Sequence, residues 1–154
     1  MSFKRELNVQ VIKTKIEKIK DSLIFIEETL PDNSQKLKES KLIRNAVYKE
    51  VEFAIEQILD ICSHINAGLR LGVPDTEDDI LKNLEVKKIF NKPIIELISE
   101  MKKFRNILVH KYGDIDDAKA YSDIKKGLKD FETVITELDA FLGKPKTKKK
   151  NKKN

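Results

Sequence analysis

The sequence has few of the residues on which disulfide-bonded, zinc-binding and membrane-spanning proteins depend. Its 154 residues include no Trp and one cysteine, Cys62, which can form no internal disulfide and gives no zinc-ligand spacing. There is no run of about 18 apolar residues, so no transmembrane helix is expected. The N-terminus also lacks the apolar core of a signal peptide. We therefore expect a cytoplasmic protein.

Glycine and proline are scarce as well, with five and four residues, whereas 37% of the chain is charged. This composition suits long, solvated helices. A chain of this length fits one domain and is long enough to bury a substantial core. Because aromatic residues make up only 6% of the chain, we expect that core to consist mainly of Ile and Leu.

The net charge of +5 comes from the end of the chain. Residues 144–154 hold seven Lys and no acid, which leaves residues 1–143 with 24 basic and 26 acidic side chains, a net charge of −2. Because Gly143 and Pro145 end the last helix, we expect residues 1–143 to form a helical domain and 144–154 to be a disordered Lys-rich tail. The tail could hold RNA through phosphate contacts without sequence preference, or act only as a solubilising segment.

Apolar residues recur at spacings of three and four along three long segments, which is the pattern of amphipathic helices. These apolar seams occupy residues 9–30, 43–65 and 121–142. Pro31 and the polar residues after it break the first helix and offer N-caps for the next. Asp116 begins the last helix. No alternation typical of strands occurs anywhere in the sequence.

Two shorter helices are expected between the second and third seams. Asp75 or Thr76 can cap a helix that runs through Leu84. Pro93 suits the first turn of another helix, which continues to Arg105. The sequence therefore predicts an all-α fold, namely an elongated, up-and-down antiparallel bundle of four to five helices.

Residues 104–112 contain the side chains best suited to chemistry. His110, one of two histidines in the chain, stands five residues after Arg105 and two before Tyr112. An Arg guanidinium can hold a phosphate through its planar fork of donors. A His titrates near neutral pH and can move a proton, and a Tyr hydroxyl can donate, accept or be modified. An Arg-x4-His pair alone is common by chance.

With its flanks, the run from Arg105 to Ile115 resembles the R-x4-H-x-Y signature of the HEPN family, and most of all its branch of HepT toxins. The resemblance extends to residues 54–65 and to the helix from Asp116, so that it covers about residues 40–142. It implies the toxin of a toxin–antitoxin module, an endoribonuclease that forms a two-fold homodimer with both motifs facing a common cleft. It also implies a minimal nucleotidyltransferase antitoxin as partner, which silences such toxins by transferring AMP to the Tyr that matches Tyr112.

Helical geometry limits how one copy of this motif can act. At about 100° per residue, Arg105 and Tyr112 fall within about 20° of one another, whereas Arg105 and His110 are about 140° apart. Either the helix distorts near Gly113, or the Arg reaches around it, or the site is shared between chains. RNA cleavage without a metal needs a base, an acid and a positive charge beside the phosphate oxygens. One motif supplies one His and one Arg, whereas a two-fold dimer supplies two of each.

We predict that Arg105 and His110 are the catalytic residues of a metal-independent endoribonuclease that is inhibited by AMP on Tyr112. No cofactor is expected, because the scattered acids form no convincing metal constellation. Asn106 could orient a His or a phosphate, or only hydrogen-bond near the helix end. Asp60 could line the cleft or orient a catalytic group, or lie on a solvated helix face.

Two other classes of function stay open. A non-catalytic HEPN module could bind nucleotide, RNA or a nucleotidyltransferase partner, and a structural bundle could serve dimerisation alone. The intact trio of Arg105, His110 and Tyr112 favours the enzyme. The other histidine, His64, lies next to Ile65 of the second apolar seam and is expected to pack against the core.

Overall fold

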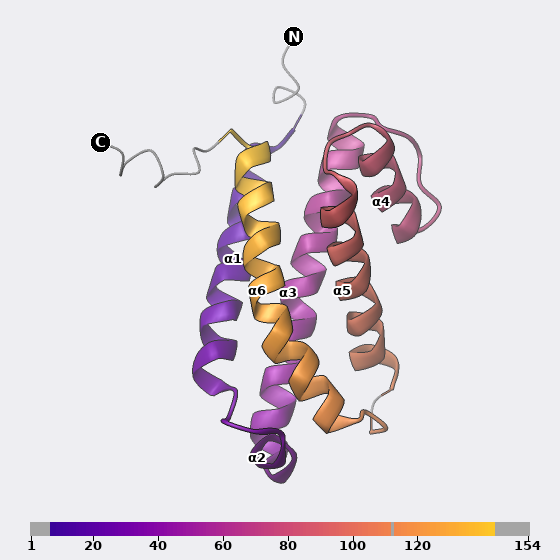
Figure 1. The fold of residues 1–154 in the computed structure, drawn as a ribbon. Coiled ribbons are helices and arrows are strands. Elements are labelled where there is room, and N and C mark those ends of the chain that lie inside the picture. Colours follow the sequence, from indigo (N-terminus) through magenta and orange to yellow (C-terminus); the bar gives the residue numbers. More distant parts are fainter. Residues whose placement is uncertain (1–6, 112, 144–154) are drawn as a thin grey trace, which may run out of the picture.

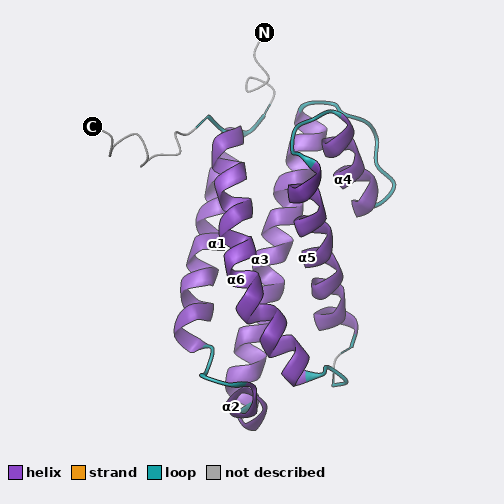
Figure 2. Ribbon diagram, viewed as in Figure 1, coloured by secondary structure: helices purple, strands orange, loops and turns teal. Residues whose placement is uncertain are grey.

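The computed structural model describes residues 7–111 and 113–143, which form six α-helices (Figure 1). The helices are α1 (Val9–Thr29), α2 (Ser34–Glu39), α3 (Lys41–Gly68), α4 (Glu77–Val86), α5 (Lys92–His110) and α6 (Asp117–Phe141). No strand occurs in these two ranges (Figure 2), and no helix within them is long and apolar enough to cross a membrane. The all-α prediction is confirmed.

The four long helices run alongside one another and make the bundle elongated. Helix α2 lies at one end of α3, and α4 lies beside α5 at the opposite end (Figure 1). Helix α3 is central, because it packs against α1, α2, α4 and α5. The Lys-rich tail predicted for residues 144–154 lies outside the described residues.

The short helix α2 is the element that the sequence pattern did not predict, so the bundle has six helices rather than four to five. Asn33 caps α2 and Ser40 caps α3, each accepting a backbone N–H three residues further on. Leu37 is fully buried and fixes α2 to the core. Six residues are too few to display a helical repeat, which explains why periodicity missed this element.

The apolar seams of the long helices meet in one core. As expected, Ile and Leu dominate the largest fully buried side chains, which include Ile12, Ile16, Ile19, Ile58, Ile61, Ile65, Ile98 and Leu138. Cys62 lies fully buried among them, and burial raises the pKa of its thiol to about 12. This cysteine is therefore a packing residue that stays protonated at neutral pH.

A small polar network joins α3, the loop before α4 and the second half of α4. The buried Asn66 side chain donates to the Gly72 carbonyl at 2.9 Å and accepts from the Asn83 amide at 3.0 Å. Gly72 has φ 144°, and a Cβ there would approach the Asn83 amide nitrogen to 3.0 Å. Of the two residues predicted to cap this helix, Asp75 and Thr76, the structure shows that Thr76 caps α4, in a capping box with Asp79. Glu77 is thereby held as the first residue of α4.

Candidate functional site

Helix α5 carries the described residues of the motif on one continuous element. Asn91 caps the helix by accepting the Ile94 N–H at 3.1 Å, and Pro93 lies in its first turn as predicted. The helix ends at His110. Gly113, with φ 83°, then turns the chain toward α6 in a conformation that favours glycine.

The Arg105 guanidinium is held by side chains from three helices. Its Nη2 donates to Glu77 Oε1 of α4 at 2.6 Å, and its Nη1 lies 3.9 Å from Glu56 Oε2 of α3. On α5 itself, Nε donates to Asn106 Oδ1 at 2.9 Å. Only 14% of the Arg105 side chain is exposed. The cation is therefore held in one orientation before any ligand arrives.

Asn106 bonds to the catalytic candidate next to it in sequence. Its amide oxygen accepts a hydrogen bond from the Arg105 guanidinium. An Arg has five N–H donors, and the hydrogen bonds to Glu77 and Asn106 use two of them. Three donors remain, and two of them are on Nη1, the nitrogen nearest Glu56.

Glu56 has an altered tendency to ionise. Burial, and then the neighbouring carboxylate of Glu52, raise the pKa of Glu56 above its ordinary value, while the positive charge of Arg105 opposes the shift. The net direction is upward, so Glu56 becomes neutral at a higher pH than a solvated Glu does. Its attraction for Arg105 weakens as it is protonated.

His110 lies at the exposed C-terminal end of α5. The helix continues without interruption to this residue, so a distortion before His110 does not remove the angular separation from Arg105. In the part of the chain that the structure describes, no hydrogen bond or ion pair joins the two side chains. The Arg105 and His110 side chains are therefore not joined directly within one chain, and Tyr112 lies outside the described residues.

The remaining sequence candidates lie elsewhere on α3. Asp60 is exposed and pairs with Lys15 of α1 at 3.4 Å, so Glu56 is the α3 carboxylate beside Arg105. His64 is exposed, and the expectation that it packs against the core is wrong. Its neighbour Ile65 is buried, but one residue turns a helix by about 100°, which carries His64 out of the seam.

The sequence did not single out Glu56 or Glu77 as partners of Arg105. They are two of 26 acidic residues, and neither belongs to a recognisable motif. Their positions next to Arg105 depend on how α3 and α4 pack against α5. Within residues 7–111 and 113–143, no group of three or more His, Cys, Asp and Glu side chains is placed to hold a metal ion.

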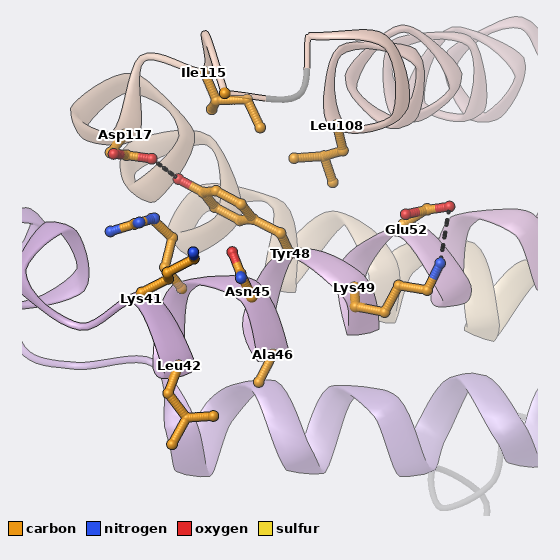
Figure 3. Close-up of a pocket in the computed structure, with 12 residues that line it drawn as sticks. Lys41, Leu42, Asn45, Ala46, Tyr48, Lys49, Glu52, Leu108, Ile115 and Asp117 are labelled. Atoms are coloured by element: carbon orange, nitrogen blue, oxygen red, sulfur yellow. Dashed lines mark hydrogen bonds and ion pairs between the residues drawn. The ribbon is translucent and has the colours of Figure 1, made fainter.

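A cavity of about 890 Å³ lies beside the end of the motif, between the first half of α3 and the connection from α5 to α6 (Figure 3). Leu108, Ile115 and Tyr48 supply apolar surface to it. The Tyr48 hydroxyl donates to Asp117 Oδ1 at 2.5 Å. Burial, and then this bond to a carboxylate, raise the pKa of Tyr48, which therefore stays a neutral donor.

Comparison with known proteins relates this chain to a family of nucleases. The family model described as Ribonuclease HepT-like matches residues 13–138. The chain is 28% identical over 130 residues to the mRNA nuclease HepT of Shewanella oneidensis, which covers 84% of this chain and 97% of that protein. It is 24% identical over 135 residues to the tRNA nuclease HepT of Aphanizomenon flos-aquae, covering 86% and 90%.

The toxin chain of one solved complex is similar to this chain over almost its whole length. It contains the tri-AMPylated Shewanella oneidensis HEPN toxin in complex with its MNT antitoxin. The TM-score is 0.76 at 28% sequence identity, and the match covers 84% of this chain and 97% of that chain.

Proposed function

Because this chain belongs to the HepT-like ribonuclease family, we propose that it is the toxin of a toxin–antitoxin module and cleaves RNA as an endoribonuclease. The observation that carries the proposal is the motif on α5, where a preoriented Arg105 and an exposed His110 lie within the matched region. Support comes from two relatives named as nucleases of mRNA and tRNA.

The proposed reaction is a transesterification within the RNA strand. The ribose 2′-oxygen attacks the adjacent phosphorus while the bond from phosphorus to the 5′-oxygen breaks. His110 exchanges protons with these oxygens, taking the proton of the 2′-OH or protonating the leaving 5′-oxygen. Arg105 stabilises the charge that develops on the phosphate. The products are a 2′,3′-cyclic phosphate and a 5′-hydroxyl, and no metal ion takes part.

Arg105 can take up a phosphate without losing its orientation. The bond from Asn106 fixes the plane of the guanidinium, and the donors not used by Glu77 and Asn106 remain for phosphate oxygens. Glu56 lies on that side. Burial, and then the neighbouring Glu52, raise its pKa, so Glu56 gives up its charge, and its attraction for Arg105, at a higher pH than an ordinary carboxylate does. Asp60, which pairs with Lys15, is assigned no step.

We place the active site at the two-fold axis of a homodimer, as the sequence predicts. Within one chain Arg105 faces α3 and α4, while His110 is exposed at the end of α5. A second copy facing the first would bring two Arg and two His side chains to one cleft. Ile107, which is 39% exposed and lies three residues before His110 on α5, gives the face that carries His110 apolar surface for such a contact.

The proposed partner is a nucleotidyltransferase antitoxin, because the similar Shewanella oneidensis toxin is AMPylated and bound to an MNT antitoxin. In the proposed modification the Tyr112 oxygen attacks the α-phosphorus of ATP and pyrophosphate leaves. Each AMP adds a negative phosphodiester and a bulky base two residues after His110. Repulsion and steric exclusion would then keep RNA phosphates out of the cleft.

The ion pair between Arg105 and Glu77 favours a second candidate, a non-catalytic module in which the Arg is structural. The ends of the RNA products distinguish the two functions. The chain should be incubated with RNA in EDTA, and the fragments should be analysed by mass spectrometry. Fragments that end in 2′,3′-cyclic phosphate support the nuclease, whereas intact RNA supports the module.

A separate experiment tests the antitoxin. Co-expression with a cognate minimal nucleotidyltransferase antitoxin should add one or more AMP masses to the wild-type chain. Tyr112→Phe should remove that addition. An unmodified wild-type chain beside an active transferase would contradict this part of the proposal.

A further inference from the structure

The cavity beside the motif carries positive charge that the proposed reaction does not use. Lys41, Arg44 and Lys49 line it, together with the carboxylates of Glu52 and Asp117. Both carboxylates already have partners in the structure. Glu52 lies 3.5 Å from Lys49, and Asp117 accepts the Tyr48 hydroxyl (Figure 3).

The lysines of this cavity are available to a ligand. Lys41 makes no hydrogen bond or ion pair with any other described residue. The pair between Lys49 and Glu52 is long, and the Lys49 side chain is 74% exposed. Although the Glu52 side chain is only 18% exposed, the ammonium group of Lys49 lies on the solvated side of this long pair and can turn to a ligand phosphate at little cost in free energy.

The cavity and Arg105 lie along the same contact between α3 and α5. Helices α3 and α5 pack against each other, and Glu56 of α3 faces Arg105 of α5. One turn away along both helices, Glu52 and Leu108 line the cavity. At a rise of about 1.5 Å per residue, Lys49 lies roughly 10 Å along α3 from Glu56. A strand whose phosphate is held at Arg105 can therefore reach the cavity with an adjacent nucleotide.

The lining suits one nucleotide. Leu108 and Ile115 face Tyr48 across the cavity (Figure 3), and such apolar and aromatic surface accepts the face of a base of any identity. Basic side chains at the same cavity bind the phosphate. The volume of about 890 Å³ falls in the range of ligand pockets, about 300–1,000 Å³.

We propose that this cavity is an RNA subsite, which binds a nucleotide flanking the scissile phosphate at Arg105. The inference rests on the proposed ribonuclease function and adds a place where the substrate strand is held. It predicts that RNA affinity depends on Lys41 and Lys49 even though neither takes part in the chemical step.

The test uses the full chain and a six-nucleotide RNA whose 2′-oxygens are methylated, so that it binds without being cleaved. Binding is measured by fluorescence anisotropy over a range of salt concentrations. Lys41→Gln/Lys49→Gln should weaken binding about tenfold. The slope of the logarithm of the binding constant against the logarithm of the salt concentration should become shallower by about 1.4, the value for two lost phosphate contacts to a single strand. Lys41→Arg/Lys49→Arg should restore both the affinity for RNA and its dependence on salt.

The matched control is Lys13→Gln/Lys18→Gln, which removes two exposed charges from α1. Thermal unfolding should show that all variants fold. If the cavity variant and the control weaken binding equally, the subsite is wrong. Cleavage of an unmodified RNA by the wild type and its loss in His110→Ala report separately on the nuclease. A cavity effect without cleavage would show that the cavity binds RNA and would reject the nuclease.

Discussion

At the scale of single residues, the central feature is a cation that is already paired. Arg105 donates to Glu77 at 2.6 Å and to Asn106 at 2.9 Å, and Glu56 lies 3.9 Å away. These contacts orient the guanidinium, but the two carboxylates also compete with a phosphate. The balance between orientation and competition should therefore set the affinity for RNA.

Glu77→Gln tests this balance. The neutral amide can still accept a hydrogen bond from Arg105 but attracts the cation less, so the KM for RNA should fall roughly threefold to tenfold. This corresponds to about 1 kcal/mol for a partly exposed charged pair. The control is Asp78→Asn, which removes the adjacent pair with Lys102 at 3.1 Å. A KM that changes equally in both variants would contradict the competition.

The raised pKa of Glu56 gives a second prediction. Because burial raises this pKa in the folded chain, the folded state binds a proton more tightly than the unfolded state does. The contribution of Glu56 to stability therefore declines as pH rises from the ordinary value of 4.5 through the raised value. Glu56→Gln should be more stable relative to wild type above this window than below it. Thermal unfolding across the window checks this, and a constant difference would refute it.

At the scale of elements, the sequence predicts the long helices well because each has a repeated apolar seam. Helix α1 was expected over 9–30 and spans Val9–Thr29, and the last helix ends within a residue of its expected end. The six-residue α2 has no such repeat. Similarly, the motif on α5 was predictable from sequence, whereas the carboxylates facing Arg105 were not, because packing of α3 and α4 brings them there.

The polar network of Asn66 fixes α4, and with it Glu77, against the bundle. Asn66→Ala would remove a buried side chain and leave the Gly72 carbonyl and the Asn83 amide without this partner in a partly buried region. The free energy of unfolding should fall by about 1–3 kcal/mol. Chemical denaturation measures it, with Gln35→Ala as control, since Gln35 is an exposed amide on α2. An equal effect of both substitutions would show that the network adds no stability.

At the scale of the whole molecule, an active site shared between two chains requires a dimer. Sedimentation at micromolar concentration should give a species of twice the 17.8 kDa chain mass. Ile107→Lys would place a charge at the exposed apolar residue one turn before His110 and should shift the protein toward monomer and lower activity together. A monomer that cleaves RNA at the full rate would contradict a site shared between two chains.

The rate of RNA cleavage by His110→Ala beside wild type, in EDTA, tests the central claim most directly. His110 is exposed and outside the core, so the variant should fold and sediment like wild type. If His110 transfers protons in the reaction, the substitution should lower the rate about 100-fold or more. Equal rates of wild type and His110→Ala on several RNAs would show that this chain is not the nuclease described.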